Sequence, residues 1–423
     1  FRTFFDNSII RTFLTVFSIT MSSAAVVVIM MLFTLSVRAV DAPKFLKNYI
    51  IEEIENLHFD SQFEFGRVQI ALSENFNPKI IVSDVTIYNN LDSLPFLEIS
   101  KLELGASLRQ ITTGNFNLST ILLDGLTIGI SRDVAGYYSI KFGQSILLTS
   151  ESDNIFSPAS MGLRKFFERE AFLDLENFTV TSMTVQYDDQ KESKLWVIDG
   201  ARIELNKQLD DVFVRGDAAF LMGGADISML QVNYETNLKS GDGSVGILFE
   251  GFPSEQIAAQ APVLSWLNVV EAPISGAFRT QVGSEMEVNE INASLKIGSG
   301  VIRADDKSKP LRFDNANVYL SYNRKINLLN FEEITINSTD LQTILAGSVQ
   351  LKVDENERTY YTGTLKATEL KANPLEIYER PLEFEDVEID FLLEPKPFNL
   401  EILKLSARDP LRELVIFAKG QII

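Results

Sequence analysis

The sequence contains no cysteine and only one histidine, His58. A chain without thiols forms no disulfide, no thiolate metal site and no cysteine nucleophile. A single imidazole does not assemble a multi-histidine metal site, and no serine motif near His58 indicates a catalytic triad. Residues 241–246 have glycine spacing without a lysine or a following helix pattern, so they predict a hairpin turn. We therefore expect no enzyme, no catalytic residue, no cofactor and no metal site.

Basic residues are also scarce. The chain has 38 Lys and Arg against 58 Asp and Glu, a net charge of −20. The first 38 residues carry three arginines and one aspartate, a charge of +2, so the remaining 385 residues carry −20 − 2 = −22. Phosphate backbones and anionic bilayer surfaces repel such a body, which excludes nucleic acid as an expected partner. Paired acidic residues such as 188–189 would suit a calcium site, but solvated turns are the simpler interpretation.

One long hydrophobic run lies near the start, where residues 12–37 contain no charged side chain. As a helix rising about 1.5 Å per residue, this run would be about 39 Å long, which exceeds the roughly 30 Å hydrocarbon core of a bilayer. A cleaved signal peptide is the alternative, with Ala39 and Ala42 near a processing site. Signal peptides usually have an apolar region of about 7–15 residues, so the length favours a retained signal anchor.

The orientation of this anchor does not follow from counting basic residues, because they lie on both sides of the run. The chain begins with Phe1 and not with Met, so further basic residues are expected before it. On that basis we expect the start of the chain to be cytoplasmic.

After the anchor the hydrophobic spacing changes twice. In residues 41–62 apolar side chains such as Phe45 and Ile54 recur at helical spacing, with Glu52 on the opposite face, which predicts an amphipathic helix covering the next domain. From residue 63 the pattern alternates, which predicts β-strands. We divide the chain into a transmembrane signal anchor (1–40), the covering helix (41–62), an N-terminal β domain (63–250) and a second β-sheet segment (251–423) that is expected to continue further.

Alternation persists to the end of the chain. Strands are predicted at residues 79–88, 97–104, 118–130, 178–187, 195–205, 212–222, 227–238, 245–252, 288–297, 318–322, 326–336, 344–353, 360–367, 387–393, 400–407 and 414–419. Only residues 161–173 and 254–267 favour helices, and Pro262 should divide the second into two short pieces. A sheet of so many strands without crossover helices must close, stack or curve. We predict a mainly β fold, in which a long, curved, groove-like antiparallel sheet with few covering helices follows a transmembrane helix.

Two stretches of the sequence resemble AsmA-like proteins of Gram-negative bacteria. Residues 99–138, most clearly 118–138 (LSTILLDGLTIGISRDVAGYY), are similar to the N-terminal region of that family, including an Arg-Asp-x-x-Gly ending at residues 132–136. Residues 251–264, GFPSEQIAAQAPVL, look like the middle region of the larger, YhdP-like members. The family often has a tryptophan shortly after the glycine of that ending, where this chain has Tyr137 and Tyr138. The stretches follow the family's order and cover less than half of the chain.

The resemblance implies a single-pass protein of the bacterial inner membrane, anchored through residues 12–37, with its large C-terminal part in the periplasm. It also implies a long twisted sheet whose apolar groove supports phospholipid transfer between the inner and outer membranes. Phospholipid is therefore the expected ligand, and an outer-membrane or envelope protein is the further partner to look for. Such transfer needs no catalytic residue, because each buried CH₂ of an acyl chain contributes about 0.8 kcal/mol.

The alternating strands supply candidate residues for one face of such a groove. The candidates for the lipid-groove lining are Ile81, Val85, Ile87, Leu102, Leu104, Ile121, Leu123, Ile128, Ile130, Val180, Val185, Val245, Ile247 and Phe249. The same alternation is typical of an ordinary sheet core, and the sequence leaves the face that stays open undetermined. If the groove is open, charged substitutions at Val85 or Ile128 should remove bound lipid while the fold persists.

Two other functions remain alternatives at this point. The first is an envelope scaffold or assembly factor that binds protein partners through its sheet edges and acidic face, without lipid transport. The second is a hydrolase of carbohydrate or lipid, which is supported only by the abundant carboxylates.

Overall fold

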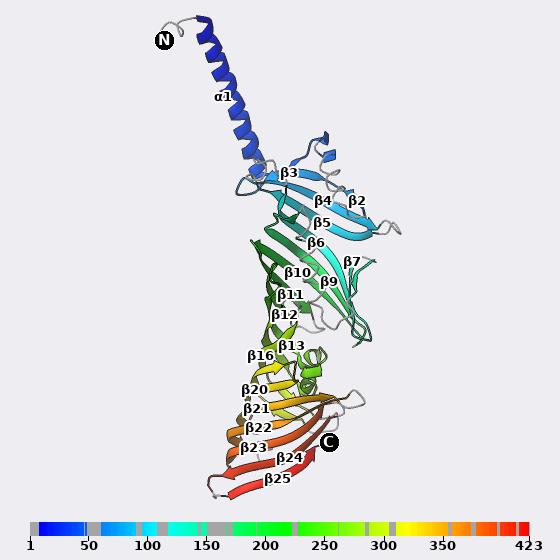
Figure 1. Ribbon diagram of the computed structural model, residues 1–423, viewed down its shortest axis with the longest axis vertical. Helices are drawn as coiled ribbons and strands as arrows, with labels where there is room; N and C mark the ends of the chain where they lie inside the picture. The colour runs from blue at the N-terminus through cyan, green and yellow to red at the C-terminus, as the bar shows by residue number, and fades with distance from the viewer. Residues whose placement is uncertain are drawn as a thin grey trace. The chain divides into compact units, whose positions relative to one another are not determined.

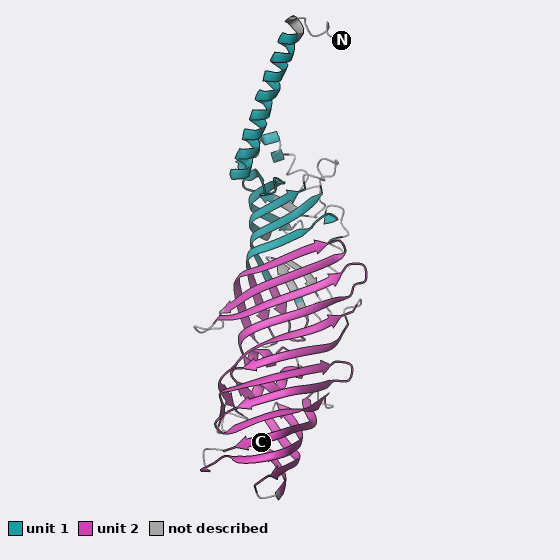
Figure 2. Ribbon diagram, turned by 90° about the vertical axis from the view of Figure 1, so that its left-hand side faces the viewer, with its two compact units in different colours: residues 1–129, 139–149, 161–183 teal, residues 130–138, 150–160, 184–423 magenta. Residues whose placement is uncertain are grey.

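The computed structural model describes residues 8–45, 47–48, 61–89, 95–107, 117–142, 145–149, 167, 172–191, 193–221, 227–260, 262–283, 287–303, 310–353, 358–373, 378–395, 398–411 and 414–422. The chain forms two compact units, coloured separately in Figure 2. Unit 1 consists of residues 1–129, 139–149 and 161–183, and unit 2 of residues 130–138, 150–160 and 184–423.

Helix α1 (Ser8–Val37) is the first element of the chain (Figure 1). The hydroxyl groups of Thr15, Thr20 and Thr34 each donate to a backbone oxygen one turn earlier at 2.8 Å, so these polar side chains are satisfied within the helix. The segment Arg11–Val37 is long and apolar enough to cross a membrane, and its most apolar part is not buried against the described chain. The predicted hydrophobic helix is therefore present.

The covering helix predicted for residues 41–62 lies largely outside the described residues. Of the described residues within it, 44–45 and 47–48 are helical, as predicted. Its expected first residue, Asp41, belongs to a short strand, β1 (Val40–Asp41), which pairs with β3 (Val68–Leu72). The carboxylate of Asp41 accepts a hydrogen bond from the side-chain amide of Gln69 at 3.0 Å. Pairing with β3 satisfies backbone groups that a helix start would leave without partners, so this residue extends the sheet.

The strands of unit 1 pair in antiparallel fashion. β2 and β3 both pair with β4, β4 pairs with β5, and β5 pairs with β6. β7 and β8 form a hairpin. Strands β6 and β9 carry residues of both units. The further bounds are β2 (Ser61–Phe65), β4 (Pro78–Asn89), β5 (Pro95–Ala106), β6 (Leu118–Arg132), β7 (Tyr138–Phe142), β8 (Ser145–Thr149) and β9 (Asn177–Asp189).

Left-handed residues interrupt the alternation of side chains in several of these strands. Asp84 in β4, Gly125 in β6 and Ser182 in β9 have φ angles of 53°, 76° and 51°. In a regular strand, residues three apart face opposite sides of the sheet. Around Asp84, however, Val82 and Val85 are both buried, with 0% and 2% of their surface exposed. The left-handed residue resets the alternation, as a β-bulge does, and keeps apolar side chains together.

The Arg-Asp-x-x-Gly ending forms a buried ion pair and a tight turn in unit 2. Nη1 of Arg132 lies 3.4 Å from Oδ2 of Asp189, and the two side chains are 8% and 1% exposed. The hydroxyl of Tyr187 donates to the same oxygen at 3.3 Å. The carboxylate of Asp133 accepts a backbone N–H within the turn, and Gly136 has a φ of 97°. A structural role therefore accounts for this motif, since removal of either charge would leave the other buried and unpaired.

Unit 2 is an antiparallel series in which successive long strands pair with one another, as the β20 to β25 region of Figure 1 shows. The strands are β10 (Lys194–Gln208), β11 (Asp211–Leu221), β12 (Ile227–Asn237), β13 (Gly243–Pro253), β15 (Pro273–Val282), β16 (Val288–Ile297), β19 (Asn315–Asn323), β20 (Leu328–Asn337), β21 (Leu341–Val353), β22 (Thr359–Ala372), β23 (Leu382–Pro395), β24 (Phe398–Asp409) and β25 (Leu414–Ile422).

These bounds confirm the predicted strands from residue 178 onward, but β15 was not predicted. Pro273 begins that strand and Gly276 lies within it, and both residue types are uncommon in strand interiors. A hairpin turn does join β12 to β13, but it comprises residues 238–242, with Gly241 at a φ of 78°, whereas residues 243–246 of the predicted turn belong to β13. The domain boundary predicted between residues 250 and 251 lies inside β13, whose pairing with β15 continues the sheet past it.

Two short helical segments lie between β13 and β15. They are α5 (Ser254–Ala258) and the 3₁₀ helix η2 (Pro262–Val269), so the predicted division of residues 254–267 at Pro262 is confirmed. A small sheet of β14 (Val270–Glu271), β17 (Gly300–Ile302) and β18 (Leu311–Phe313) follows η2. The helix predicted at residues 161–173 lies outside the described residues except for its buried Phe167 and Phe172 and the exposed Leu173.

The fold class is as predicted: a mainly β chain with a large antiparallel sheet, one N-terminal apolar helix and few short helices. Among the described residues the sheet does not close into a barrel, because β25 pairs with β24 alone.

Candidate functional site: an apolar face of the sheet in unit 2

One face of the unit 2 sheet is built from alternating apolar side chains. Ile247 of β13 lies opposite Val232 of β12 and Phe278 of β15. Val245 and Phe249, two residues to either side of Ile247, share its face. Phe249 belongs to one apolar cluster with side chains of α5 and η2, and we call this face the inner face.

Aromatic rings contact one another in series on the inner face. Neighbouring ring centroids lie 5.2 to 6.4 Å apart, in tilted, edge-to-face or stacked arrangements. Such aromatic pairs contribute about 0.5–1.5 kcal/mol each beyond their buried area. We call this series the aromatic strip, and its members in order of contact are Tyr187, Trp196, Phe220, Phe252, Phe249 and Phe278.

Part of the inner face remains partly exposed. Within the aromatic strip, Phe220 and Phe249 are buried, whereas Trp196, Phe252 and Phe278 each retain exposed surface. Neighbouring aliphatic side chains of β11 to β13 are half-buried in the same way. We call this region the half-buried stretch, and its members are Trp196, Val214, Leu230, Val232, Tyr234, Ile247, Phe252 and Phe278.

A second part of the inner face is covered by η2. The indole of Trp266 packs edge-to-face on Phe331 of β20, with centroids 6.2 Å apart. The hydroxyls of Ser265 and Tyr361, which lies in β22, are hydrogen-bonded at 2.9 Å. Leu267 has no exposed surface. We call this region the covered stretch, and its sheet members are Val318, Leu329, Phe331, Tyr361 and Phe391.

Burial in the covered stretch raises the pKa of the phenol of Tyr361, which contacts η2. Tyr361 is only 2% exposed. Burial disfavours the charged phenolate and raises the pKa of Tyr361 to about 12, although the hydrogen bond from Ser265 acts in the opposite direction. Tyr361 therefore stays neutral at physiological pH and serves as a hydrogen-bonding anchor for η2.

The segment that carries η2 is bonded at both ends to the small sheet of β14, β17 and β18. The hydroxyl of Ser254 donates to the backbone oxygen of Val270, which joins the start of α5 to β14. At the other end, Nε of Arg303 lies 2.7 Å from the carboxylate of Glu271. The backbone N–H of Arg303 donates to the backbone oxygen of Val269 at 2.8 Å. These bonds hold η2 in place over the covered stretch.

In unit 1 the strand register places most of the predicted lining residues on one face. Leu102 pairs with Leu123, and Leu104 pairs with Ile121. Ile81 is the exception, because it neighbours Val82 and lies opposite Glu103. Adjacent residues of a strand face opposite sides, so Ile81 belongs to the polar face, and the prediction that it shares the lining face is wrong.

Burial divides the predicted lining residues into two groups. Those that are buried are Val85, Ile121, Val180, Val185, Val245 and Phe249. Those that are half-buried are Ile81, Ile87, Leu102, Leu104, Leu123, Ile128, Ile130 and Ile247. Because Val85 is only 2% exposed, a charge there would be buried without a partner, so that substitution would damage the fold. The burial of Val85 therefore argues against the expectation that charged substitutions there leave the fold intact, and Ile247 is the better test position.

The sequence reasoning missed several inner-face residues. Val214, Val232 and Tyr234 lie in strands that were predicted, and for Val232 and Tyr234 the alternation with polar neighbours was a usable signal. Phe278 was missed because β15 was missed. The contacts of the aromatic strip join rings as far apart as Tyr187 and Phe278 in the sequence, and no local pattern encodes such contacts.

The described residues contain no group of three or more His, Asp or Glu side chains placed to hold a metal ion. Comparison with protein-family models, with curated proteins and with solved structures found no match for this chain.

Proposed function

We propose that this chain is an AsmA-like envelope protein without catalytic activity, which binds phospholipid acyl chains on the apolar inner face of its sheet. In this proposal, α1 anchors the chain in the bacterial inner membrane, and the large C-terminal part lies in the periplasm. The protein supports lipid transfer between the inner and outer membranes.

The observation that carries the proposal is the half-buried stretch. Its side chains, including Trp196, Ile247 and Phe278, are apolar yet retain exposed surface across neighbouring strands. A contiguous apolar surface of this kind is unfavourable in water, and a ligand with apolar chains removes it from water at about 25 cal/mol per Å². Acyl chains match it because they are flexible, apolar and long enough to cross several strands, which lie about 4.8 Å apart.

The test compares two isoleucines in unit 2 that face opposite sides. Ile247 lies on the inner face, whereas Ile344 of β21 is 57% exposed on the other face, opposite Thr335. The full chain and its Ile247→Glu and Ile344→Glu variants are purified in detergent, and co-purified lipid is extracted and quantified by mass spectrometry. We expect bound phospholipid in the parent chain and in Ile344→Glu, and a loss of most of it in Ile247→Glu.

A crosslinking experiment locates the lipid. Benzoylphenylalanine replaces Phe278 of the half-buried stretch or, as the control, Tyr319 of β19, which is 46% exposed on the opposite face. Irradiation in membranes should attach phospholipid at position 278 and not at position 319. Equal labelling at both positions, or none at either, would contradict an acyl-chain surface on the inner face.

An envelope scaffold is the second candidate, and the covered stretch favours it. There η2 fills the inner face with the protein's own side chains, so that Leu267 and Leu329 have 0% and 1% of their surface exposed. A scaffold needs no ligand surface. A stable stoichiometric complex with an envelope protein, obtained from a chain that carries no lipid, would favour this function over transfer.

A further inference from the structure

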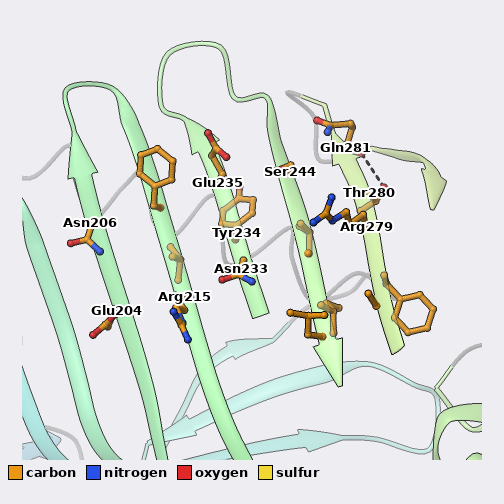
Figure 3. Close-up of a pocket in the computed structure, with 18 residues that line it drawn as sticks. Glu204, Asn206, Arg215, Asn233, Tyr234, Glu235, Ser244, Arg279, Thr280 and Gln281 are labelled. Atoms are coloured by element: carbon orange, nitrogen blue, oxygen red, sulfur yellow. Dashed lines mark hydrogen bonds between the residues drawn. The ribbon is translucent and has the colours of Figure 1, made fainter. Parts of the chain in front are cut away.

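The opposite face of the unit 2 sheet contains a hollow of about 470 Å³ across strands β10 to β15, lined by both polar and apolar residues (Figure 3). Side chains of both charges reach it from neighbouring strands. We call it the outer hollow, and its charged and amide members are Glu204, Asn206, Arg215, Asn233, Glu235, Arg279 and Gln281. Two of these members, Arg215 and Arg279, are positively charged, although the chain as a whole has a net charge of −20.

Two of these charges are already paired with neighbours. Arg215 donates to the carboxylate of Asp217 at 3.3 to 3.4 Å, and Arg202 donates to Glu204. Glu235 and Arg279, by contrast, have no ion-pair partner among the described residues, and both are exposed. The outer hollow therefore offers one positive and one negative charge for a ligand.

Strand β13 separates these two charges and forms the floor between them. Glu235 lies opposite Ser244, and Arg279 lies opposite Gly246. A side chain at Gly246 would meet nothing within 4 Å, so the floor there is clear. Figure 3 shows the guanidinium of Arg279 directed toward β13. From strand spacing, the Cα atoms of Glu235 and Arg279 are about 12 Å apart, on the same face of the sheet.

An apolar hollow of about 660 Å³ adjoins the outer hollow on the same face. The two hollows share Leu248 and Ala277, which pair with each other across β13 and β15. Leu248 and Met229 are 48% and 55% exposed. Small residues such as Ala219 also line the apolar hollow. The outer hollow, with its two opposite charges, is thus continuous along the strands with the apolar hollow.

From this arrangement we infer that the outer hollow binds the zwitterionic headgroup of a phosphoethanolamine lipid. Arg279 holds the phosphate, Glu235 holds the ammonium group, and an acyl chain lies over Leu248 and Met229. This inference rests on the proposed function in one respect, that the ligand is a phospholipid. The site itself is separate, because it lies on the face opposite the half-buried stretch. A saccharide would use the amides and the charges, but it would leave the adjoining apolar hollow unused.

The test uses soluble headgroup probes and the full chain in micelles of an uncharged polyoxyethylene detergent. Glycerophosphoethanolamine, glycerophosphoglycerol, inorganic phosphate and maltose are titrated, and binding is followed by calorimetry. Arg279→Glu should weaken glycerophosphoethanolamine binding about tenfold or more, because a charge-assisted bond is replaced by repulsion. The control Arg312→Glu, at an exposed arginine of β18 outside the hollow, should leave binding unchanged.

Two further variants examine the ammonium and acyl parts of the site. Glu235→Lys should reverse the preference, so that glycerophosphoglycerol binds better than glycerophosphoethanolamine. Dihexanoyl phosphatidylethanolamine should bind more tightly than its headgroup alone, and Leu248→Asn should remove that gain. Circular dichroism confirms that each variant is folded, which is expected because all three positions are exposed.

Several outcomes would overturn the inference. One is equal affinity in Arg279→Glu and Arg312→Glu, and another is binding of phosphate alone as tight as that of glycerophosphoethanolamine. Maltose binding that depends on Arg279 would assign the site to saccharides. Ile247 also borders the hollow, but its side chain faces the other side of the sheet, because it alternates with Gly246 and Leu248 along β13. Loss of lipid in Ile247→Glu therefore reports on the inner face, and failure here is distinguishable from failure of the proposed function.

Discussion

The covered and half-buried stretches of the inner face are made of the same kinds of residues, yet only one of them is covered. Beneath η2, Leu329 and Tyr361 are 1% and 2% exposed, whereas Val232 and Tyr234 of β12 are only half-buried. The difference lies in the segment between β13 and β15, which contacts β20 and β22 through Trp266 and Ser265. The alternation of side chains in the strands therefore produces an apolar face, and a separate element, η2, determines which part of that face the protein buries with its own side chains.

This comparison gives η2 and the proposed acyl chain equivalent roles. Each removes apolar sheet surface from water, at about 1.5–3 kcal/mol for each large side chain that becomes fully buried. Where η2 covers the sheet, this free energy contributes to the stability of the fold. Where no described helix does so, the gain is available to a ligand.

The largest effect is expected for Leu267→Ala in η2. Leu267 has no exposed surface, so the truncation removes apolar contacts and leaves a cavity in the covered stretch. We expect a loss of about 2–5 kcal/mol in the free energy of unfolding. Urea denaturation followed by circular dichroism measures it, and a loss below about 1 kcal/mol would show that η2 packs loosely and that the two stretches are alike.

The next effect is alkaline destabilisation through Tyr361. Its pKa is about 12 in the folded protein and about 10 when unfolded, so the unfolded chain releases this proton first as the pH rises. This contribution is complete below pH 10 and is lost as the pH rises toward 12, with a total of about 2–3 kcal/mol.

The free energy of unfolding, measured as the pH rises from below the reference tyrosine pKa of about 10 to the folded-state pKa of about 12, tests this contribution. Tyr361→Phe should remove this part of the slope, because phenylalanine has no proton to lose. Tyr319→Phe, at an exposed position on the other face, serves as the matched control and should keep it. An unchanged slope in Tyr361→Phe would place the alkaline effect elsewhere.

A smaller effect is expected in the half-buried stretch. Val232→Ala removes two methyl groups that are already partly exposed, so the cost should be about 1 kcal/mol. If phospholipid binds there, adding it should raise the midpoint of thermal unfolding of the parent chain more than that of Val232→Ala. A loss as large as that of Leu267→Ala would mean that this stretch is as fully packed as the covered one.

The smallest effect is expected on the opposite face at Lys366→Ala. Lys366 lies 3.5 Å from the carboxylate of Glu388, and its own side chain is 66% exposed. Exposed pairs of this kind contribute little at physiological salt. The urea midpoint should therefore stay within experimental error of the parent chain, and a clear shift would indicate a charge network on this face.

The sequence predicted the strands well where their alternation was regular, and less well where single residues altered it. Pro262 correctly divided the helical segment, because proline removes a backbone donor. The prediction that Ile81 lines the groove failed because the left-handed Asp84 resets the alternation along β4. Val82 and Val85 therefore lie on the same face of the sheet, and Ile81 lies on the other face. A left-handed aspartate in a strand has no distinct sequence signature, and such resets are visible only in the backbone.

The sequence by itself determined the apolar N-terminal helix and the series of half-apolar strands, because both follow from local periodicity and bilayer dimensions. Only the tertiary structure decided that η2 packs over Phe331 and Tyr361, that aromatic rings from Tyr187 to Phe278 contact in series, and that Arg279 and Glu235 share a hollow. The reason is physical: these contacts join residues far apart in the sequence, and strand register, which brings them together, is fixed by pairing across the whole sheet.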